Sequence, residues 1–380
     1  LIRGYDGRLY FTIGDRGYHI RTAEGNILSD PASGAVFRCE MDGTGLEVYA
    51  RGLRNPQEIA FNDRGDWFSV DNNSDSGDRA RIVHLLQDGD SGWRMYYQYL
   101  ADRGPFNRER IWEPANEDQP ASIVPPVANF TDGPSGLAYY PGTGFGDQLD
   151  DTFLICDFRG GPSNSGIRSF KVSPKGATYE LVSDDQPIWT CLATDIAFGP
   201  DGALYVSDWV DGWDGLGKAR IYRIENPKHA GDSTAAGNSR LHAVWGLGHI
   251  ARLASEETEL GSLKSLLIGL ALDPDVDVSV AALKIAGELG WNEATRSAQA
   301  ALSSDQPRVR YTAIETLGRL KDESAMDQVL SLAIELDRED TEIRHAASMF
   351  LYRAVPEDKL ASLAAHPREY ARTLADVALR

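Results

Sequence analysis

The sequence predicts two unlike repeat modules in one chain: an all-β propeller up to residue 226 and an all-α solenoid of the HEAT or armadillo type over residues 238–380. In the first part, short runs rich in aromatic and β-branched residues recur between turn residues, as they do in propellers. In the second part, turn residues become rare and apolar residues recur at helical intervals. Residues 227–237, rich in small and polar residues, are predicted to link the two modules.

Length and composition agree with two folded modules. A chain of 380 residues is long enough for two cores, because a single core seldom grows beyond about 250–300 residues. The net charge of −19 disfavours nucleic acid as a partner, since such binding depends on lysine and arginine side chains that neutralise phosphates. No apolar run reaches the roughly 18 residues typical of a transmembrane helix, so no transmembrane segment is predicted. Three scattered cysteines, Cys39, Cys156 and Cys191, are predicted to be buried free thiols.

A five-residue phrase marks the start of successive propeller blades. It occurs as QEIAF at 57–61, SGLAY at 135–139 and TDIAF at 194–198, each time before a turn and a second β-rich run. About four blades of up to four strands are predicted, either as a complete small ring or as the later part of a larger one. Further strand candidates are residues 34–41, 46–52, 81–86, 91–95, 166–172, 177–182 and 219–224.

The helical part repeats in its own register. The apolar residues Leu241, Val278, Val309 and Ile343 occupy the same place in four similar helices, with spacings of 37, 31 and 34 residues. Asp-rich turns precede these helices, and further amphipathic helices follow them. This pattern predicts a solenoid of helix pairs, with about three to four repeats sharing one core.

The segment GLRNPQ holds the first group of candidate site residues. Loops that enter the innermost strands of a propeller gather around its central channel, so Arg54, Asn55 and Gln57 are expected to project toward the channel mouth. A guanidinium beside a carboxamide suits a planar anionic ligand. The alternative is that Arg54 pairs with a neighbouring blade and that the Asn-Pro pair only forms the turn.

An acidic loop follows the next strand. Asp71, Asn73 and Asp75 alternate in the order that wraps hard oxygen ligands around calcium, and Gly77 and Asp78 extend the series. The loop lacks the sixth-position glycine and the twelfth-position glutamate of an EF-hand. The alternative is a solvated acidic turn.

Three further positions complete the candidate set. His19, expected on a loop just after a strand, is a possible base, although a solvated histidine is the more ordinary interpretation. Asp157 with Arg159, and Asp208 with Trp209, occupy the equivalent strand end in later blades. These two pairs either line the same mouth or brace neighbouring blades.

Several motifs resemble one known family. LYFTIGDRG, GAVFRCEMDGTG and GLRNPQEIAF, followed by the acidic loop and GDSGW, resemble the soluble quinoprotein glucose and sorbosone dehydrogenases. Members of that family are six-bladed propellers that bind pyrroloquinoline quinone (PQQ) and calcium and oxidise sugars. The later phrases and the helical repeats look like large bacterial proteins, frequent in planctomycetes, that join such a propeller to HEAT-like repeats and often to a haem-binding c-type cytochrome domain.

The resemblance implies roles for particular residues. Arg54, Asn55 and Gln57 match the quinone-contacting motif, and the calcium loop matches the region that holds Asp71, Asn73, Asp75 and Asp78, although this loop is more acidic than the usual Gly-Pro form. The four blades would be the later part of a six-bladed ring, cut at the N-terminus. The catalytic histidine of the family would then fall before Leu1, which leaves His19 as a weak candidate. The paired arginines that the sugar enzymes use late in the propeller are not found.

The resulting functional prediction is a quinone-dependent oxidoreductase that oxidises a sugar or related alcohol and passes electrons to a c-type cytochrome domain or protein. From the resemblance alone, its location would be the bacterial periplasm or the exterior of the cell. The alternative is a non-catalytic propeller and HEAT module that binds a glycan or a protein partner.

Overall fold

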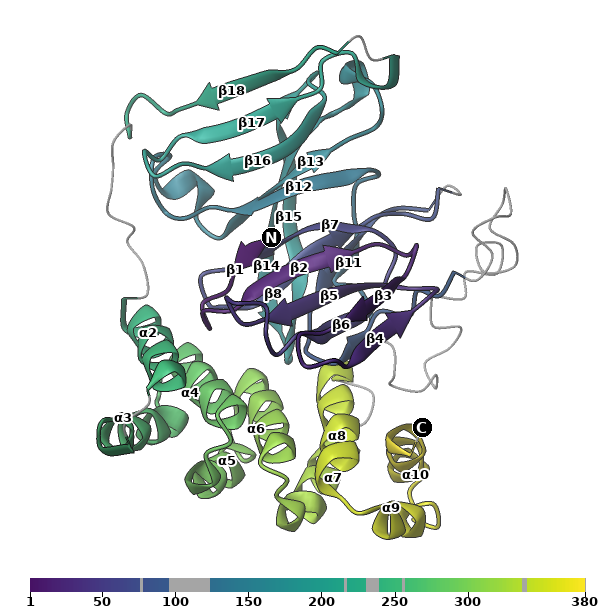
Figure 1. Ribbon diagram of the computed structural model, residues 1–380, viewed down its shortest axis with the longest axis vertical. Coiled ribbons are helices and arrows are strands. Elements are labelled where there is room, and N and C mark those ends of the chain that lie inside the picture. The colour runs from purple at the N-terminus through teal and green to yellow at the C-terminus, as the bar shows by residue number, and fades with distance from the viewer. Residues whose placement is uncertain are drawn as a thin grey trace.

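The computed structural model confirms the predicted fold class, with sheets in the first part of the chain and helices in the second (Figure 1). It describes residues 1–75, 78–95, 124–214, 217–229, 239–254, 257–336 and 340–379. Part of the predicted linker lies outside these residues. The last strand before it ends at Ile224, and the first helix after it begins at Ser239.

The first sheet has five strands. Their spatial order is β1 (Ile2–Arg3), β2 (Leu9–Ile13), β5 (Gly34–Cys39), β6 (Glu47–Leu53) and β10 (Gly89–Asp90). All neighbours in this sheet are antiparallel except β10, which joins β6 in parallel. A separate hairpin is formed by β3 (Tyr18–Arg21) and β4 (Ile27–Asp30).

Each of three further sheets contains one copy of the recurrent five-residue phrase. The second sheet has the order β11 (Ala128–Asn129), β9 (Arg81–His84), β8 (Trp67–Asp71) and β7 (Pro56–Phe61). The third has the order β12 (Pro134–Tyr139), β13 (Thr152–Asp157), β14 (Gly166–Lys175) and β15 (Thr178–Trp189). The fourth consists of β16 (Ala193–Phe198), β17 (Leu204–Asp208) and β18 (Arg220–Ile224). The three copies of the phrase form β7, β12 and β16, and β12 contacts the other two.

Two details of the predicted strands are wrong. Residues 91–95 form no strand, because Trp93 is instead buried with its indole N–H donated to the Asp15 carboxylate at 3.0 Å. The fourth strand of that blade is β11, which comes later in the chain. His19 lies within β3 and not on a loop, since residues 18–21 pair with β4 across a turn at Gly25.

Aromatic side chains fill the space between neighbouring sheets. The ring centroid of Phe153 lies 5.0 Å from that of Phe68 in the second sheet and 5.0 Å from that of Phe170 on the adjacent strand. All three rings are buried. Burial of such a side chain contributes about 1.5–3 kcal/mol, so these contacts hold consecutive sheets together.

The helices form the predicted solenoid. The α-helices are α2 (Ser239–Leu253), α3 (Glu257–Gly269), α4 (Val276–Glu288), α5 (Thr295–Ala301), α6 (Pro307–Arg319), α7 (Met326–Leu336), α8 (Thr341–Ala354), α9 (Glu357–Leu363) and α10 (Glu369–Ala378). Short 3-10 helices are η1 (Asp147–Leu149), η2 (Pro162–Asn164), η3 (Gly212–Asp214), η4 (Leu270–Leu272), η5 (Asn292–Ala294) and η6 (Glu323–Ala325). None of the described helices has the length and apolarity needed to cross a membrane.

The predicted helical register is confirmed. Leu241, Val278, Val309 and Ile343 are all buried, on α2, α4, α6 and α8 respectively, and these four helices pack in that order. They form the layer nearer the sheets, while α3, α5 and α7 lie farther away (Figure 1). An aspartate caps α8, since the Asp340 carboxylate accepts the backbone N–H of Ile343, as the Asp-rich turns suggested.

Ion pairs join the helices to the sheets. Arg38 of β5 donates to the Glu288 carboxylate of α4 at 2.8 Å, and Arg308 of α6 donates to Asp66, just before β8, at 2.6 Å. Farther along, Arg353 of α8 pairs with Asp88. Because these groups are largely buried, each needs its partner to offset the loss of water.

Candidate functional site

A cavity of about 740 Å³ opens where the second, third and fourth sheets expose the same edge. In each of these sheets the inner strand begins, and the next strand ends, at the cavity. Its volume lies in the range of about 300–1,000 Å³ that small-molecule sites occupy. The lining residues are Gln57, Asn72, Asn73, Asp75, Asp132, Gly133, Pro134, Ser135, Phe158, Arg159, Gly160, Thr194, Trp209 and Trp213.

An aspartate ends the second strand of each of these sheets. Asp71, Asp157 and Asp208 each lie opposite the first residue of the paired inner strand, and all three are buried. Asp208 accepts the backbone N–H of Leu192 at 3.0 Å, and Asp157 accepts two bonds from Arg159. The repeated aspartate therefore fixes the loops around the cavity, while the predicted bracing between neighbouring blades stays a prediction.

The residue after each repeated aspartate faces the cavity. Asn72, Phe158 and Trp209 occupy this position in the three sheets, and all three line the cavity. Arg159 lines it as well, so the two predicted pairs divide their roles: the aspartates brace the loops, whereas Arg159 and Trp209 line the mouth. The signal was visible in the sequence as the repeated strand endings FSVDN, LICDF and YVSDW.

Of the three residues in the GLRNPQ motif, Gln57 lines the cavity directly. Arg54 donates to the Asp75 carboxylate at 2.5 Å, and its buried Nε has no hydrogen-bond partner among the described residues. This pair lies within one blade, not between neighbouring blades. Asn55 lies against the TIGD turn, where a Cβ on Gly14 would come within 2.8 Å of the amide oxygen of Asn55.

The acidic loop is bonded to itself and to its own blade. The Asp71 carboxylate accepts the backbone N–H groups of Arg54 and Asn55, at 2.9 and 2.8 Å, and it pairs with Arg81. Nearby, the Asn73 side chain donates to the Asp132 carboxylate at 2.5 Å. Most of these carboxylate oxygens thus accept hydrogen bonds from the protein itself.

These contacts decide the fit of a metal ion. Asp78 accepts both the backbone N–H and the hydroxyl of Ser74, and residues 76–77, including Gly77, lie outside the described residues. In the described part of the chain, no group of three or more His, Cys, Asp or Glu side chains is placed to hold a metal. These contacts occupy several of the oxygen atoms that would bind calcium, and calcium binding by Asp71, Asn73, Asp75 and Asp78 stays a prediction from which no step is derived.

One side of the cavity is aromatic. The rings of Phe158 and Trp209 are stacked at 6.0 Å with an angle of 19°, and Trp213 stands edge-on to Trp209 at 4.8 Å. Sequence reasoning missed Phe158, although the strand ending LICDF marks its position. It also missed Trp213, because the spacing between β17 and η3 does not reveal that a loop turns back toward the third sheet. Aromatic rings that line a cavity suit a planar or ring-shaped ligand, which can pack on their faces.

The rest of the lining is polar. Gln57 and Thr194 come from inner strands, while the carboxylates of Asp75 and Asp132 come from loops. Ser135 is buried, and its hydroxyl has no hydrogen-bond partner among the described residues. A buried hydroxyl of this kind is available to a ligand, because it can both donate and accept.

The cavity offers hydrogen-bond donors to PQQ, the cofactor that the sequence motifs imply. Arg159 and Gln57 would hold its oxygens, and Arg54 would join them on leaving Asp75. PQQ is a tricarboxylate, so the carboxylates of Asp75 and Asp132 oppose its binding. The fit therefore depends on an exchange of partners at Arg54.

Beside the cavity lies a pair of carboxyl groups. Glu58, one residue after Gln57, accepts the backbone N–H of Leu137 at 2.6 Å. Burial, together with the neighbouring Asp195 carboxylate, raises the pKa of Glu58 to about 7. Gly136 permits this approach of strands, because a Cβ there would come within 2.5 Å of the Asp195 Cα.

His19 lies apart from the cavity lining. Its Nδ1 is 3.2 Å from the Ser29 hydroxyl on β4, and the side chain is exposed. It is not among the residues that line the cavity, and its role as a base stays a prediction.

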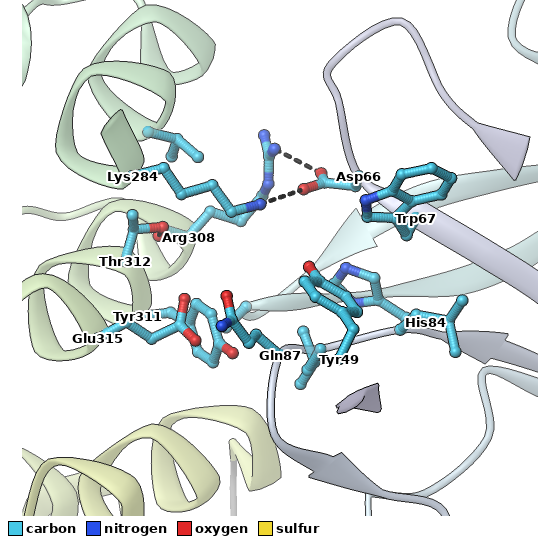
Figure 2. Close-up of a pocket in the computed structure, with 14 residues that line it drawn as sticks. Tyr49, Asp66, Trp67, His84, Gln87, Lys284, Arg308, Tyr311, Thr312 and Glu315 are labelled. Atoms are coloured by element: carbon cyan, nitrogen blue, oxygen red, sulfur yellow. Dashed lines mark hydrogen bonds and ion pairs between the residues drawn. The ribbon is translucent and has the colours of Figure 1, made fainter. Parts of the chain in front are cut away.

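A second hollow lies between the sheets and the solenoid (Figure 2). Its volume is only about 20 Å³, enough for about one water molecule. Figure 2 shows Arg308 and Lys284 reaching from the helices to Asp66.

Burial and nearby charges shift two pKa values at this hollow. Burial alone would raise the pKa of Asp66, but Arg308 and Lys284 hold it below its usual range. Burial lowers the pKa of the adjacent His84 to about 4, which keeps the imidazole neutral. This hollow is a structural contact.

Comparison with known protein families identifies both modules. Residues 1–213 match the family described as "Domain of unknown function (DUF7133)", and residues 263–351 match HEAT repeats. The fold and the cavity define a β-propeller protein with a helical-repeat extension. Because the first match spans more than half of the chain, the protein belongs to the DUF7133 family. No curated protein matches the chain.

Solved structures with a similar fold include several sugar dehydrogenases. A crystal structure of glucose dehydrogenase is 17% identical with a TM-score of 0.41, over 58% of this chain and 61% of that one. The apo form of soluble aldose sugar dehydrogenase from Escherichia coli is 18% identical with a TM-score of 0.38, over 53% and 58%. The PQQ-bound aldose sugar dehydrogenase from Streptomyces coelicolor is 20% identical with a TM-score of 0.37, over 59% and 60%. The chain thus spans about three fifths of the length of these proteins.

Proposed function

We propose that this protein oxidises a sugar or a related alcohol with a quinone cofactor, and that the cavity among the second, third and fourth sheets binds the small molecule. The observation that carries the proposal is the lining of this cavity. Aromatic rings form one side, and amide, hydroxyl and carboxylate groups form the rest.

This division suits a sugar. The C–H faces of a sugar ring are apolar and can pack on the rings of Phe158 and Trp209. Its hydroxyl groups both donate and accept hydrogen bonds, which matches the amide of Gln57 and the hydroxyl of Ser135, which has no partner within the described ranges. The carboxylates of Asp75 and Asp132 accept from hydroxyl groups, and such charge-assisted bonds are the stronger ones.

The quinone is proposed from the sequence motifs. When bound, PQQ would supply a two-electron acceptor for the hydride lost by the carbon that bears the hydroxyl, and the hydroxyl proton would pass to a base. The part of the chain that is proposed to hold it comprises Arg54, Gln57 and Arg159. The proposed electron acceptor is a c-type cytochrome, and the proposed location is the bacterial periplasm or exterior; both rest on the resemblance alone.

A reconstitution experiment tests the proposal. The protein is incubated with PQQ, with and without calcium, and dye-linked oxidation is followed over a panel of sugars and alcohols. We expect turnover that depends on both protein and quinone, and its loss in the pair Arg54→Ala and Asn55→Ala with circular dichroism unchanged. Tyr352→Ala, which removes a 64% exposed ring from α8, is the control.

Two outcomes contradict the proposal. Absence of PQQ binding at micromolar concentration would show that the protein does not use this quinone as a cofactor. Binding of a glycan without turnover in any condition supports the alternative, a non-catalytic module.

A further inference from the structure

We propose that the cavity takes a neutral oligosaccharide and that Trp213 forms an outer stacking subsite for a sugar unit beyond the one held inside. The inference deepens the proposed function and rests on it, because it assigns a substrate class to the same cavity. Three observations carry it: the exposure of Trp213, the way the ring is held, and the charge and size of the cavity.

Trp213 extends the aromatic wall outward. Its ring stands at 89° to Phe158 and 73° to Trp209, with centroids 6.1 and 4.8 Å away. The side chain is nevertheless 74% exposed, although it lines the cavity. Removing apolar surface from water is favourable by about 25 cal/mol for each Å². A ligand that covers this exposed ring therefore gains binding free energy.

The exposed ring is held in place by backbone. Gly160, with φ +81°, lies so close that a Cβ there would come within 3.3 Å of the Trp213 ring. Gly212, with φ +64°, would place a Cβ 2.7 Å from the Gly160 carbonyl oxygen. Both conformations favour glycine, so the two loops meet without side chains between them. The indole therefore has a supporting surface on one side and solvent on another.

The charge of the lining selects among ring-shaped ligands. Asp75 and Asp132 place two carboxylates on the cavity, and Arg159, the guanidinium that lines it, is bonded to Asp157. An acidic sugar would meet these carboxylates unfavourably, whereas neutral hydroxyl groups donate to them. The net charge of −19 acts in the same direction at long range.

The size of the cavity favours more than one sugar unit. A volume of about 740 Å³ lies in the upper half of the range for small-molecule sites, and a single hexose is smaller than the ligands typical of that range. One unit on Phe158 and Trp209 leaves room toward Trp213. The chain of sugar units then leaves the cavity across the exposed indole.

Binding measurements by isothermal titration calorimetry test the subsite. The probes are neutral glucose oligosaccharides of α and β linkage, from monosaccharide to hexasaccharide, and uronic-acid oligosaccharides of the same lengths. We expect affinity to rise with length for a neutral series. Trp213→Ala should lower oligosaccharide affinity about tenfold and leave monosaccharide affinity unchanged. Tyr352→Ala, an exposed ring on the solenoid, should change neither.

The results separate this inference from the proposed function. Oligosaccharide binding that depends on Trp213 without any oxidation supports the subsite and counts against the oxidoreductase. Oxidation of monosaccharides with no gain from length, or an unchanged affinity in Trp213→Ala, overturns the subsite and leaves the oxidoreductase standing. Stronger binding of uronic-acid chains overturns the assignment of a neutral ligand.

Discussion

Two polar regions of the molecule differ in how completely their groups are paired. At the contact between the sheets and the solenoid, Asp66 is buried and bonded to Arg308, and the hollow there holds about one water. At the cavity, Asp75 and Trp213 stay exposed, and the buried hydroxyl of Ser135 has no partner among the described residues. The contrast separates buried, paired groups that hold the two modules together from cavity groups that are open to solvent or, like the Ser135 hydroxyl, have no partner among the described residues.

The largest expected effect lies at the contact between the modules. Arg308→Ala leaves the Asp66 carboxylate buried without its main partner, so we expect a loss of about 3 kcal/mol in the free energy of unfolding. Urea denaturation followed by circular dichroism measures it. The control is Lys175→Ala, which breaks an exposed pair with Glu180 and should cost less than about 1 kcal/mol. Equal effects of the two variants would contradict the structural role of the contact.

A slightly smaller effect on the free energy of unfolding is expected at Asp71, which fixes a loop at the cavity. Asp71→Ala removes the acceptor of two backbone N–H groups and leaves Arg81 without its carboxylate partner, so the free energy of unfolding should fall by about 2–3 kcal/mol. The melting temperature of the unmodified protein should be the same in EDTA and in calcium. A clear drop in EDTA, abolished in Asp71→Ala, would restore Asp71 as a calcium ligand.

The third effect depends on pH. Because the pKa of Glu58 is raised to about 7 in the folded state, the folded protein holds this proton more tightly than the unfolded chain. The contribution is complete below the ordinary pKa of glutamate and is lost as pH rises through about 7. Glu58→Gln should remove about 2 kcal/mol of this pH dependence between pH 5 and pH 8. Parallel stability curves for the two proteins would contradict the shift.

The smallest effect on stability is expected at the rim. Asp75→Asn weakens a pair whose carboxylate is 56% exposed, so the free energy of unfolding should change by less than about 1 kcal/mol. It also releases Arg54 and removes a negative charge, so PQQ should bind about fivefold more tightly. Fluorescence titration with PQQ measures this. Weaker binding in Asp75→Asn would show that Arg54 is not a quinone ligand.

Much of the fold could be predicted from the sequence, because the repeats are local. The phrases at 57–61, 135–139 and 194–198 each place an inner strand, and one register of apolar residues places α2, α4, α6 and α8. The strand predicted at residues 91–95 was wrong. Trp93 and Met95 alternate as buried residues of a strand do, but both are buried within a loop. Their partners, Asp15 and Ala32, are too distant in sequence for a local pattern to reveal.

The site was less predictable, because its chemistry depends on which atoms meet. The alternation of Asp71, Asn73 and Asp75 does resemble a metal loop. However, the carboxylate of Asp71 already accepts hydrogen bonds from Arg81 and from two backbone N–H groups. The three repeated strand endings were a better signal, since they mark both the brace and the residue that faces the cavity.

The central claim is that the cavity, and not the contact between the modules, carries the chemistry. Its most direct test is the rate of PQQ-dependent, dye-linked oxidation of the sugar panel by the unmodified protein, by Trp209→Ala and by Tyr352→Ala, with folding of each confirmed by circular dichroism. The account predicts a protein-dependent rate that falls at least about tenfold in Trp209→Ala and is unchanged in Tyr352→Ala. Equal rates in all three proteins, or no protein-dependent rate with any sugar, would contradict it.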